Sequence, residues 1–215
     1  MFELYSYFRS SAAYRVRIAL GLKGLNYTTV PVHLLRDGGE QLSARYLAIN
    51  PEGLVPALAD GSQIITQSLA IIEYLDEAYS PASLLPQAPL ERARVRALAL
   101  HIACDIHPLN NLRVLRYLSH QAGLGLEARN DWYRHWIVTG FQALEKQLAH
   151  SPDTGLCCHG DQPGLADCCL IPQVFNAQRY EVDLGPFPTI ARIATHCETH
   201  PAFQAAHPAR QPDAE

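Results

Sequence analysis

Residues 1–80 alternate between strand-like and helix-like patterns, and no other feature of the sequence restricts the fold as much. The expected elements run in the order strand, helix, strand, strand, strand, helix, over residues 2–7, 12–23, 27–32, 55–59, 63–67 and 68–79. Gly24 is placed to end the first helix, and Asp60-Gly61 is a strong hairpin signal between two of the short strands. This order predicts an α/β layer in which the hairpin adds an antiparallel edge to a partly parallel sheet.

After residue 80 the pattern changes from alternation to helical spacing. Prolines 81, 86 and 89 suit a linker, and the apolar residues between 90 and about 178 recur mostly at helical intervals. We therefore expect two domains, over residues 1–80 and 88–215, and a fold class of α/β followed by all-α. The last residues, HPARQPDAE, are polar enough to form a surface extension.

The charge and the cysteines argue against several classes of function. The formal net charge is −4 at pH 7 and Lys and Arg form no run, which disfavours a wide basic surface for nucleic acid. MFELYSYF is not expected to act as a signal peptide, and no apolar run approaches the roughly 18 residues that span a bilayer. Six cysteines are present without any C-x-x-C pair, so neither a disulfide framework nor a metal site is favoured. We expect a soluble cytoplasmic protein.

Six short segments, spread over nearly the whole chain, resemble the zeta class of glutathione transferases in order and spacing. They are RSSAAYRVRIALGLKG, INPEGLVPAL, QSLAIIEYLDE, DIHPLNNLRVL, PQVFNAQRYEVDLGPFP and HPARQPD. Their agreement in register across both expected domains gives the comparison its weight. The resemblance implies a thioredoxin-like N-terminal domain, an all-helical C-terminal domain, a homodimer and glutathione as cofactor.

The resemblance also implies an activity. This class includes isomerases of maleyl diketo acids, so we expect a glutathione-dependent cis–trans isomerase, with maleylacetoacetate from aromatic amino acid breakdown as its first candidate substrate. Maleylpyruvate isomerisation and general glutathione transfer to α-halo acids are the alternatives among enzymes. A non-catalytic interaction module with the same fold is the alternative from another class.

Ser10 and Ser11 stand where the first strand meets the first helix. A thiol with an ordinary pKa of about 8.5 is mostly protonated at neutral pH, so an enzyme that uses glutathione as a nucleophile must favour the thiolate. The N–H groups of a helix start and a serine hydroxyl both do so, although a serine there also serves as a simple helix cap. The resemblance assigns the thiolate role to Ser10, with Ser11 and Ala12 beside it. Where the family commonly has Ser-Ser-Cys, Ala12 and Ala13 remove a nearby thiol.

Three further places carry the expected contacts of glutathione. The resemblance implies a cis bond between Val55 and Pro56 that turns the Val55 backbone toward the cysteinyl unit, where the plain alternative is a proline at a strand edge. Gln67 and Ser68 stand at an expected helix start and would hold the γ-glutamyl carboxylate, or act only as a cap. Gln41 would contact the glycyl end, unless it is an ordinary exposed glutamine.

The segment DIHPLNNLRVL is expected on the first long helix of the second domain. His107 and Asn111 are four residues apart and would share a face of that helix. The resemblance implies that His107, Asn111, Leu112 and Arg113 line the glutathione or substrate pocket, partly across a dimer interface. The alternative for His107 is a structural hydrogen bond.

Arginines are the expected partners of a dicarboxylate-like substrate, because guanidinium groups bind carboxylates bidentately. Arg179 is the first candidate for this clamp, and Arg9 and Arg113 are the others. Each has the alternative of a surface or structural ion pair.

A helix start at GLADCCLIPQV is expected to be structural. Gly164 takes the capping position and has no side-chain oxygen, so Asp167 must hold this start by its own bonds to backbone N–H groups.

Overall fold

The computed structural model describes residues 1–79 and 83–215, and these form two compact units. The first unit contains Met1–Leu84 together with Glu198–Glu215, and the second contains Leu85–Cys197. By packing, the last residues therefore group with the N-terminal part of the chain. The domain limits expected from the sequence stay a prediction, and the end of the first one, residue 80, lies outside the described residues.

A mixed four-stranded sheet forms the base of the first unit, with strand order β2-β1-β3-β4. Its strands are β1 (Phe2–Ser6), β2 (Tyr27–Pro31), β3 (Ala57–Asp60) and β4 (Gln63–Thr66). The β1 and β2 strands are parallel, whereas β3 pairs antiparallel with both β1 and β4. The predicted antiparallel hairpin edge is confirmed, but Asp60 pairs with Gln63, so the turn itself is Gly61-Ser62. Gly61 has a φ of 60°, which suits glycine.

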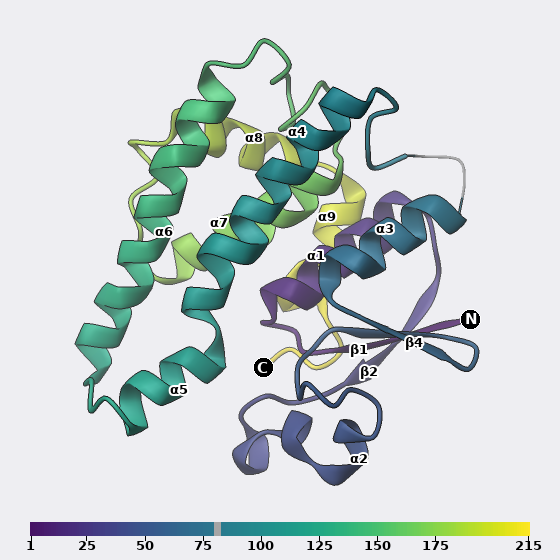
Figure 1. Cartoon of the computed structure of the whole chain (residues 1–215), viewed down its shortest axis with the longest axis vertical. Helices are drawn as coiled ribbons and strands as arrows, with labels where there is room; N and C mark the ends of the chain where they lie inside the picture. Colours follow the sequence, from purple (N-terminus) through teal and green to yellow (C-terminus); the bar gives the residue numbers. More distant parts are fainter. Residues whose placement is uncertain (80–82) are drawn as a thin grey trace. The chain divides into compact units, whose positions relative to one another are not determined.

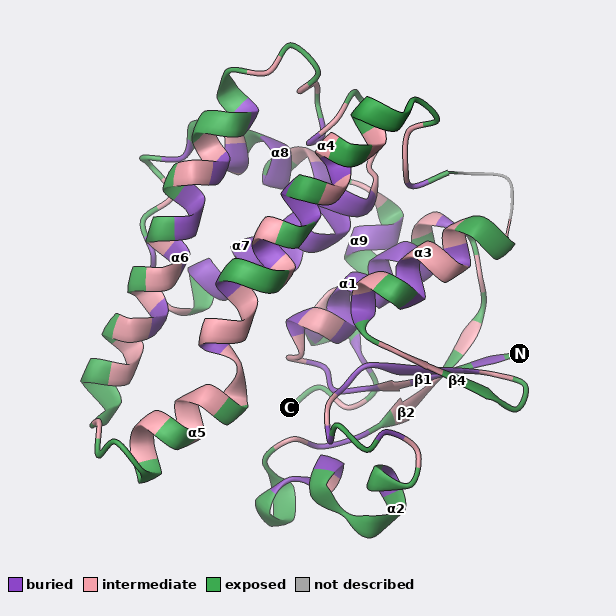
Figure 2. Cartoon of the chain, viewed as in Figure 1, coloured by how far each residue is buried: buried purple, intermediate pink, exposed green. Residues whose placement is uncertain are grey.

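The helices of the first unit pack mainly around α1. Helix α1 (Ser11–Leu22) contacts α3 (Ser68–Ala78) and the short α9 (Pro201–Ala206), and α1 and α3 lie over one face of the sheet while α2 (Ala44–Leu47) lies beyond the other (Figure 1). Most of α1 is buried, as its colouring in Figure 2 shows. Gly24, with φ 64°, follows the end of α1 as predicted.

The C-terminal segment lies largely at the surface, as its polarity suggested, but it is also anchored to the first unit. Pro208 and Gln211 are buried, and the Gln211 amide donates to the carbonyl oxygens of Ala205 and His207. Near the chain end, the Asp213 carboxylate accepts the N–H of Phe8 at 2.9 Å. The polarity of the segment did not reveal this anchoring, in which Gln211 and Asp213 satisfy backbone groups of the unit.

The second unit is helical, which confirms the predicted all-helical part of the fold. The longer helical segments are α4 (Pro89–Leu100), α5 (Leu112–His120), α6 (Leu126–Ala149), α7 (Leu165–Arg179) and α8 (Pro188–Glu198). Helix α7 packs against α4 and is buried along most of its length (Figure 2). Pro89 is the first residue of α4 rather than part of a linker, because proline is well tolerated at a helix start. Pro81 lies outside the described residues.

Asp167 holds the start of α7 as predicted. Its Oδ2 accepts the N–H of Gly164 and its Oδ1 accepts the N–H of Cys158, each at 2.9 Å. Burial raises the pKa of this carboxyl above its ordinary value, although the two N–H donors oppose that shift. Within residues 1–79 and 83–215, no helix is long and apolar enough to cross a membrane.

Candidate active site

Ser10 is the N-cap of α1. Its Oγ accepts a hydrogen bond from the N–H of Ala13 at 3.2 Å, and its backbone is extended, as a cap requires. A hydroxyl that accepts through a lone pair keeps its own proton for a second partner. The cap and the thiolate donor are therefore compatible roles for one serine.

The residues next to Ser10 differ in exposure. Ser11 is buried at the first position of α1, and Ala12 is half-buried. Arg9 is half-buried as well, with its guanidinium 4.7 Å from the ring centre of Phe8 and 3.1 Å from the hydroxyl of Tyr7. The Nε of Arg9 is buried without a hydrogen-bond partner among the described residues, so this arginine retains donor capacity for a ligand.

The peptide bond between Val55 and Pro56 is cis, as expected. Both residues are buried, and they precede β3. The turn before them is fixed at Leu54, whose carbonyl accepts from the Tyr46 hydroxyl at 2.6 Å and from the Asn50 amide at 2.8 Å. The backbone of Val55 is thus held in one place just before β3, an inner strand of the sheet.

Gln67 and Ser68 begin α3. Gln67 has a φ of 67°, a conformation that non-glycine residues rarely adopt and that often marks a functional position. Its amide donates to both carboxylate oxygens of Glu52, at 3.1 and 3.0 Å. Ser68 is buried, and its Oγ accepts a hydrogen bond from Arg15 at 3.2 Å.

Gln41 is buried, not exposed like an ordinary surface glutamine. Its amide lies over Gly39, where a Cβ would collide with it. The Oε1 of Gln41 has no hydrogen-bond partner among the described residues. Buried polar atoms are nearly always bonded, so this oxygen is suited to a ligand donor.

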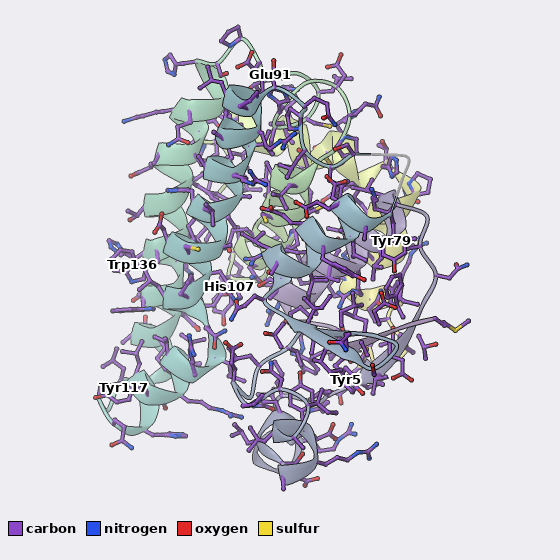
Figure 3. The ribbon with its side chains drawn as sticks, turned by 45° about the vertical axis from the view of Figure 1, so that its right-hand side comes forward. Tyr5, Tyr79, Glu91, His107, Tyr117 and Trp136 are labelled. Carbon is purple, nitrogen blue, oxygen red and sulfur yellow. The ribbon has the colours of Figure 1, made fainter. Side chains whose placement is uncertain are left out.

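The expected long helix through His107 and Asn111 is wrong. The run that begins with α4 continues as a π-helical segment, His101–Ile106, and a 3₁₀ turn, His107–Asn110, and it then ends at Asn111, whose backbone is extended. His107 is half-buried where this run ends (Figure 3). Pro108 contributes to this change, because proline has no N–H to continue the hydrogen bonds of an α-helix, although His107 before it keeps α-helical dihedral angles.

Asn111 is the N-cap of α5, and its Oδ1 accepts the N–H of Arg113 at 3.1 Å. Leu112 is half-buried at the first position of α5, and the Arg113 side chain is exposed. The structure therefore joins Asn111 and Arg113 through a cap, and the expectation that His107 and Asn111 share a face of one helix is wrong.

Arg179 is exposed at the end of α7, with its guanidinium 5.7 Å from the ring centre of Tyr180. Tyr180 stacks on Tyr133 at 3.6 Å between ring centres. The stacked pair gives Arg179 an ordered aromatic neighbour, and Arg179 itself is exposed. Arg179 and Arg113 are thus accessible in the chain by itself.

Two residues of the first unit were missed by the sequence reasoning. Arg15 is buried on α1 and donates to Ser68, and Glu52 holds the amide of Gln67. A signal existed for Arg15, because an arginine within the apolar run of a buried helix needs a polar partner. No local pattern distinguishes Glu52 from other exposed acids.

The chain matches the family model described as the glutathione S-transferase N-terminal domain over residues 4–83. It is 53% identical to the probable maleylacetoacetate isomerase of Vibrio cholerae, over 98% of this chain and 97% of that relative. A solved bacterial maleylpyruvate isomerase, described as a glutathione transferase of the zeta class, superposes with a TM-score of 0.96 at 47% identity, covering 99% of this chain and 100% of the other. This chain belongs to the zeta class of glutathione transferases.

The zeta-class assignment brings a liganded relative into the comparison. The maleylacetoacetate isomerase of Methylobacterium extorquens, crystallised with malonate and glutathione, superposes with a TM-score of 0.95 at 43% identity over 99% of each chain. The thioredoxin-like first domain expected from the sequence is confirmed by the family match and by this likeness. As a zeta-class glutathione transferase, the chain is an enzyme.

Proposed function

We propose that this enzyme is a glutathione-dependent cis–trans isomerase of a maleyl diketo acid, most specifically maleylacetoacetate. The observation that carries the proposal is the position of Ser10 at the start of α1, in a chain whose relatives at about this length are named as such isomerases. The hydroxyl proton and the N–H groups of the helix start form a site that favours a thiolate.

The first unit has the donors and acceptors that glutathione needs. The start of α3 at Gln67 and Ser68 would take the γ-glutamyl carboxylate, since the N–H groups of a helix start bind anions. The backbone of Val55 beside cis-Pro56 would pair with the cysteinyl unit. The unbonded Oε1 of Gln41 would accept the glycyl N–H.

When bound, glutathione supplies a thiolate that adds to the cis double bond and leaves after rotation about the resulting single bond. Ser10 would donate its hydroxyl proton to the sulfur as a hydrogen bond, which keeps the thiol deprotonated at neutral pH. Ser11 and Ala12 would supply backbone N–H groups at the same helix start. We expect His107, Asn111, Leu112 and Arg113 to contact glutathione or the substrate.

Arginines would select the substrate by its carboxylates. Arg179 is our first candidate, because its guanidinium is accessible over the stacked Tyr180. Arg9 is supported by its unbonded Nε and Arg113 by its exposure. The malonate bound by the Methylobacterium extorquens relative, a small dicarboxylate, favours a site of this kind.

We also propose a cytoplasmic homodimer. Helix α4 and the segment after it expose small and apolar side chains along one side, at Ala93, Ala97, Leu100 and Cys104. Such a face is suited to a second copy of the chain. Sedimentation that finds only a fully active monomer would contradict this part of the proposal.

The proposal is tested by offering maleylacetone and maleylpyruvate separately with glutathione and comparing kcat/KM. We expect isomerisation of both, a larger value for maleylacetone, and no turnover without glutathione. A larger value for maleylpyruvate would favour the sister activity, which the solved maleylpyruvate isomerase also supports. Conjugation of α-halo acids without isomerisation would favour a general transferase, and glutathione binding without any turnover would favour the interaction module.

A further inference from the structure

Most of the cysteines lie in the interior of the second unit. They come from the segment between α6 and α7, from α7 itself and from the last turn of α8. A buried thiol by itself needs no explanation, because it packs like a small apolar side chain. The case for a site rests on what two of these thiols contact. The buried cysteines are Cys157, Cys158, Cys168, Cys169 and Cys197.

Cys157, Asp167 and Cys197 bring three metal-ligating groups together. One ligand atom from each, the two Sγ atoms and a carboxylate oxygen, all lie within 4.8 Å of one another. Each of the three residues is 1% exposed or less. The sequence did not favour a metal site because it has no C-x-x-C pair. These ligands come instead from three separate segments, which only the fold brings together.

The two thiols of this cluster interact with each other and are not joined by a disulfide. A hydrogen bond links the Cys157 and Cys197 side chains, and this bond together with burial raises the pKa of Cys197 well above that of an ordinary thiol. The Cys197 sulfur therefore stays protonated as long as no cation is near. A metal ion reverses this preference, because it binds the thiolate and displaces the proton.

Asp167 is a fully buried acid, a residue type that is almost never buried without a partner of opposite charge. Among residues 1–79 and 83–215, no lysine, arginine or histidine forms an ion pair with it. Its carboxylate accepts the N–H groups of Cys158 and Gly164 and the thiol of Cys158. A carboxylate offers about four lone pairs, so these donors leave room for one further bond.

The cluster thus combines two thiols with a buried acid that lacks a cation. We propose that the second unit binds a thiophilic divalent cation, Zn²⁺ foremost, through the Sγ atoms of Cys157 and Cys197 and a carboxylate oxygen of Asp167. A mixed set of sulfur and oxygen suits Zn²⁺, whereas Mg²⁺ and Ca²⁺ take oxygen ligands. The ion joins the segment before α7 to α7 and α8, so its role is structural and independent of the proposed isomerase.

The charge balance of binding is favourable for a buried site. Two S–H bonds break, two Zn–S bonds form, and two protons pass to the buffer. With Asp167 ionised, the net charge of the cluster does not change, because one divalent cation replaces two protons. The remaining negative charge lies in the first turn of α7, where the partial positive charge of a helix start stabilises an anion.

The test uses the full chain with Cys104→Ala, which removes the exposed thiol and is the parent of all variants. The reduced protein, free of glutathione, is incubated with Zn²⁺, Cd²⁺ or Mg²⁺ just below its thermal midpoint, so that local opening admits the ion. We expect one Zn²⁺ or Cd²⁺ per chain, release of two protons per ion, and a thiolate-to-cadmium charge-transfer band. The thermal midpoint should rise with Zn²⁺ concentration and not respond to Mg²⁺.

Three alanine variants locate the site. Cys157→Ala and Cys197→Ala should each lose most of the cadmium band. Each should also weaken Zn²⁺ binding by more than the roughly 10- to 100-fold typical of groups that only orient a metal ligand. Cys168→Ala is the matched control, because Cys168 is a buried cysteine of the same unit outside the cluster, and it should bind Zn²⁺ like the parent.

The inference fails in either of two ways. Unchanged affinity and band in Cys157→Ala and Cys197→Ala would overturn it, because the ion would then be bound by surface side chains. A parent protein that binds no ion, or binds Cd²⁺ without the thiolate band, would overturn it as well and leave a cysteine cluster that only packs. Should these two variants fail to fold, the cadmium band and the proton count of the parent decide the outcome.

Discussion

Ser10 Oγ accepts a hydrogen bond from the N–H of Ala13 at 3.2 Å. The serine proposed to act on the thiolate of glutathione therefore also caps α1, the helix whose start favours that thiolate. The two functions use different parts of the hydroxyl, the lone pair and the proton. They can be separated by substitutions that affect stability and chemistry to different degrees.

We expect Ser10→Ala to lower kcat by roughly 100-fold, as losing one donor to a reacting anion does elsewhere, and to lower the free energy of unfolding by about 1 kcal/mol. Ser10→Gly should lower kcat equally but cost only a few tenths of a kcal/mol, since glycine is a tolerated cap. The measurements are kcat, the thiolate absorbance of bound glutathione, and denaturant unfolding. If kcat fell in proportion to the free energy of unfolding in the two variants, Ser10 would act only as a helix cap.

Arg179→Met should remove a carboxylate partner from the substrate. Because Arg179 is exposed, we expect a loss of about 1.5 to 3 kcal/mol in transition-state binding, or roughly 10- to 100-fold in kcat/KM for the charged diketo acid. Conjugation of glutathione to a neutral electrophile should be nearly unchanged, and Arg192→Met, another exposed arginine of the second unit, should affect neither rate. Equal losses of rate on both electrophiles would contradict the role of Arg179, and Arg9 or Arg113 would then be the candidate partner of the substrate carboxylate.

Asp167→Ala should destabilise the second unit by about 2 to 5 kcal/mol, because it leaves the buried N–H of Cys158 and the partly buried N–H of Gly164 without an acceptor. Asp167→Asn keeps one acceptor oxygen and should cost about half as much. Asp161→Ala is the control, since its carboxylate is exposed and the loss should stay below about 1 kcal/mol. Denaturant midpoints measure the three values, and equal costs for Asp161 and Asp167 would contradict the structural role.

His207 should make the protein less stable in mild acid. Burial lowers the pKa of its imidazole, with Arg17 and Arg210 acting in the same direction and Glu198 opposing them. The folded state therefore prefers the neutral ring, whose Nδ1 accepts the N–H of Ala209. The contribution of His207 to the free energy of unfolding is present above pH 6.5, the ordinary histidine pKa. It is lost as the pH falls through the lower pKa that His207 has in the folded state.

The check is the pH dependence of the unfolding free energy in the wild type and in His207→Asn. Asparagine also accepts an N–H at a cap but does not titrate. We expect a steeper loss of stability below pH 6.5 in the wild type than in the variant. Parallel curves would mean that His207 titrates alike in the folded and unfolded states.

The sequence predicted the elements whose signals are local. Gly24 ends α1, the β3–β4 hairpin forms one residue from its expected turn, and Asp167 bonds the backbone at the start of α7. Each of these depends on residues within a few positions, and the resemblance to the zeta class added the cis bond before Pro56.

What could not be predicted depends on contacts between distant segments. The hydrogen bond from Arg15 to Ser68 joins two helices, and the bond from Phe8 to Asp213 joins the two ends of the chain. No periodicity encodes such pairs. The break at Asn111 was missed for a different reason, because the helical spacing of apolar residues does not distinguish one continuous helix from consecutive π, 3₁₀ and α segments.

The packing of the C-terminal segment on the first unit has a consequence for the order of folding. Synthesis delivers β1 and α1 early, whereas α9, whose Ala202 lies against Gly21 of α1, leaves the ribosome only after the whole second unit. Domains tend to fold as they emerge, so the second unit can complete its core while α1 still has an uncovered side. The first unit, which is proposed to hold the thiol site, is therefore the first to start folding and the last to be completed. A nascent chain cannot have a complete first unit before α9 has been synthesised.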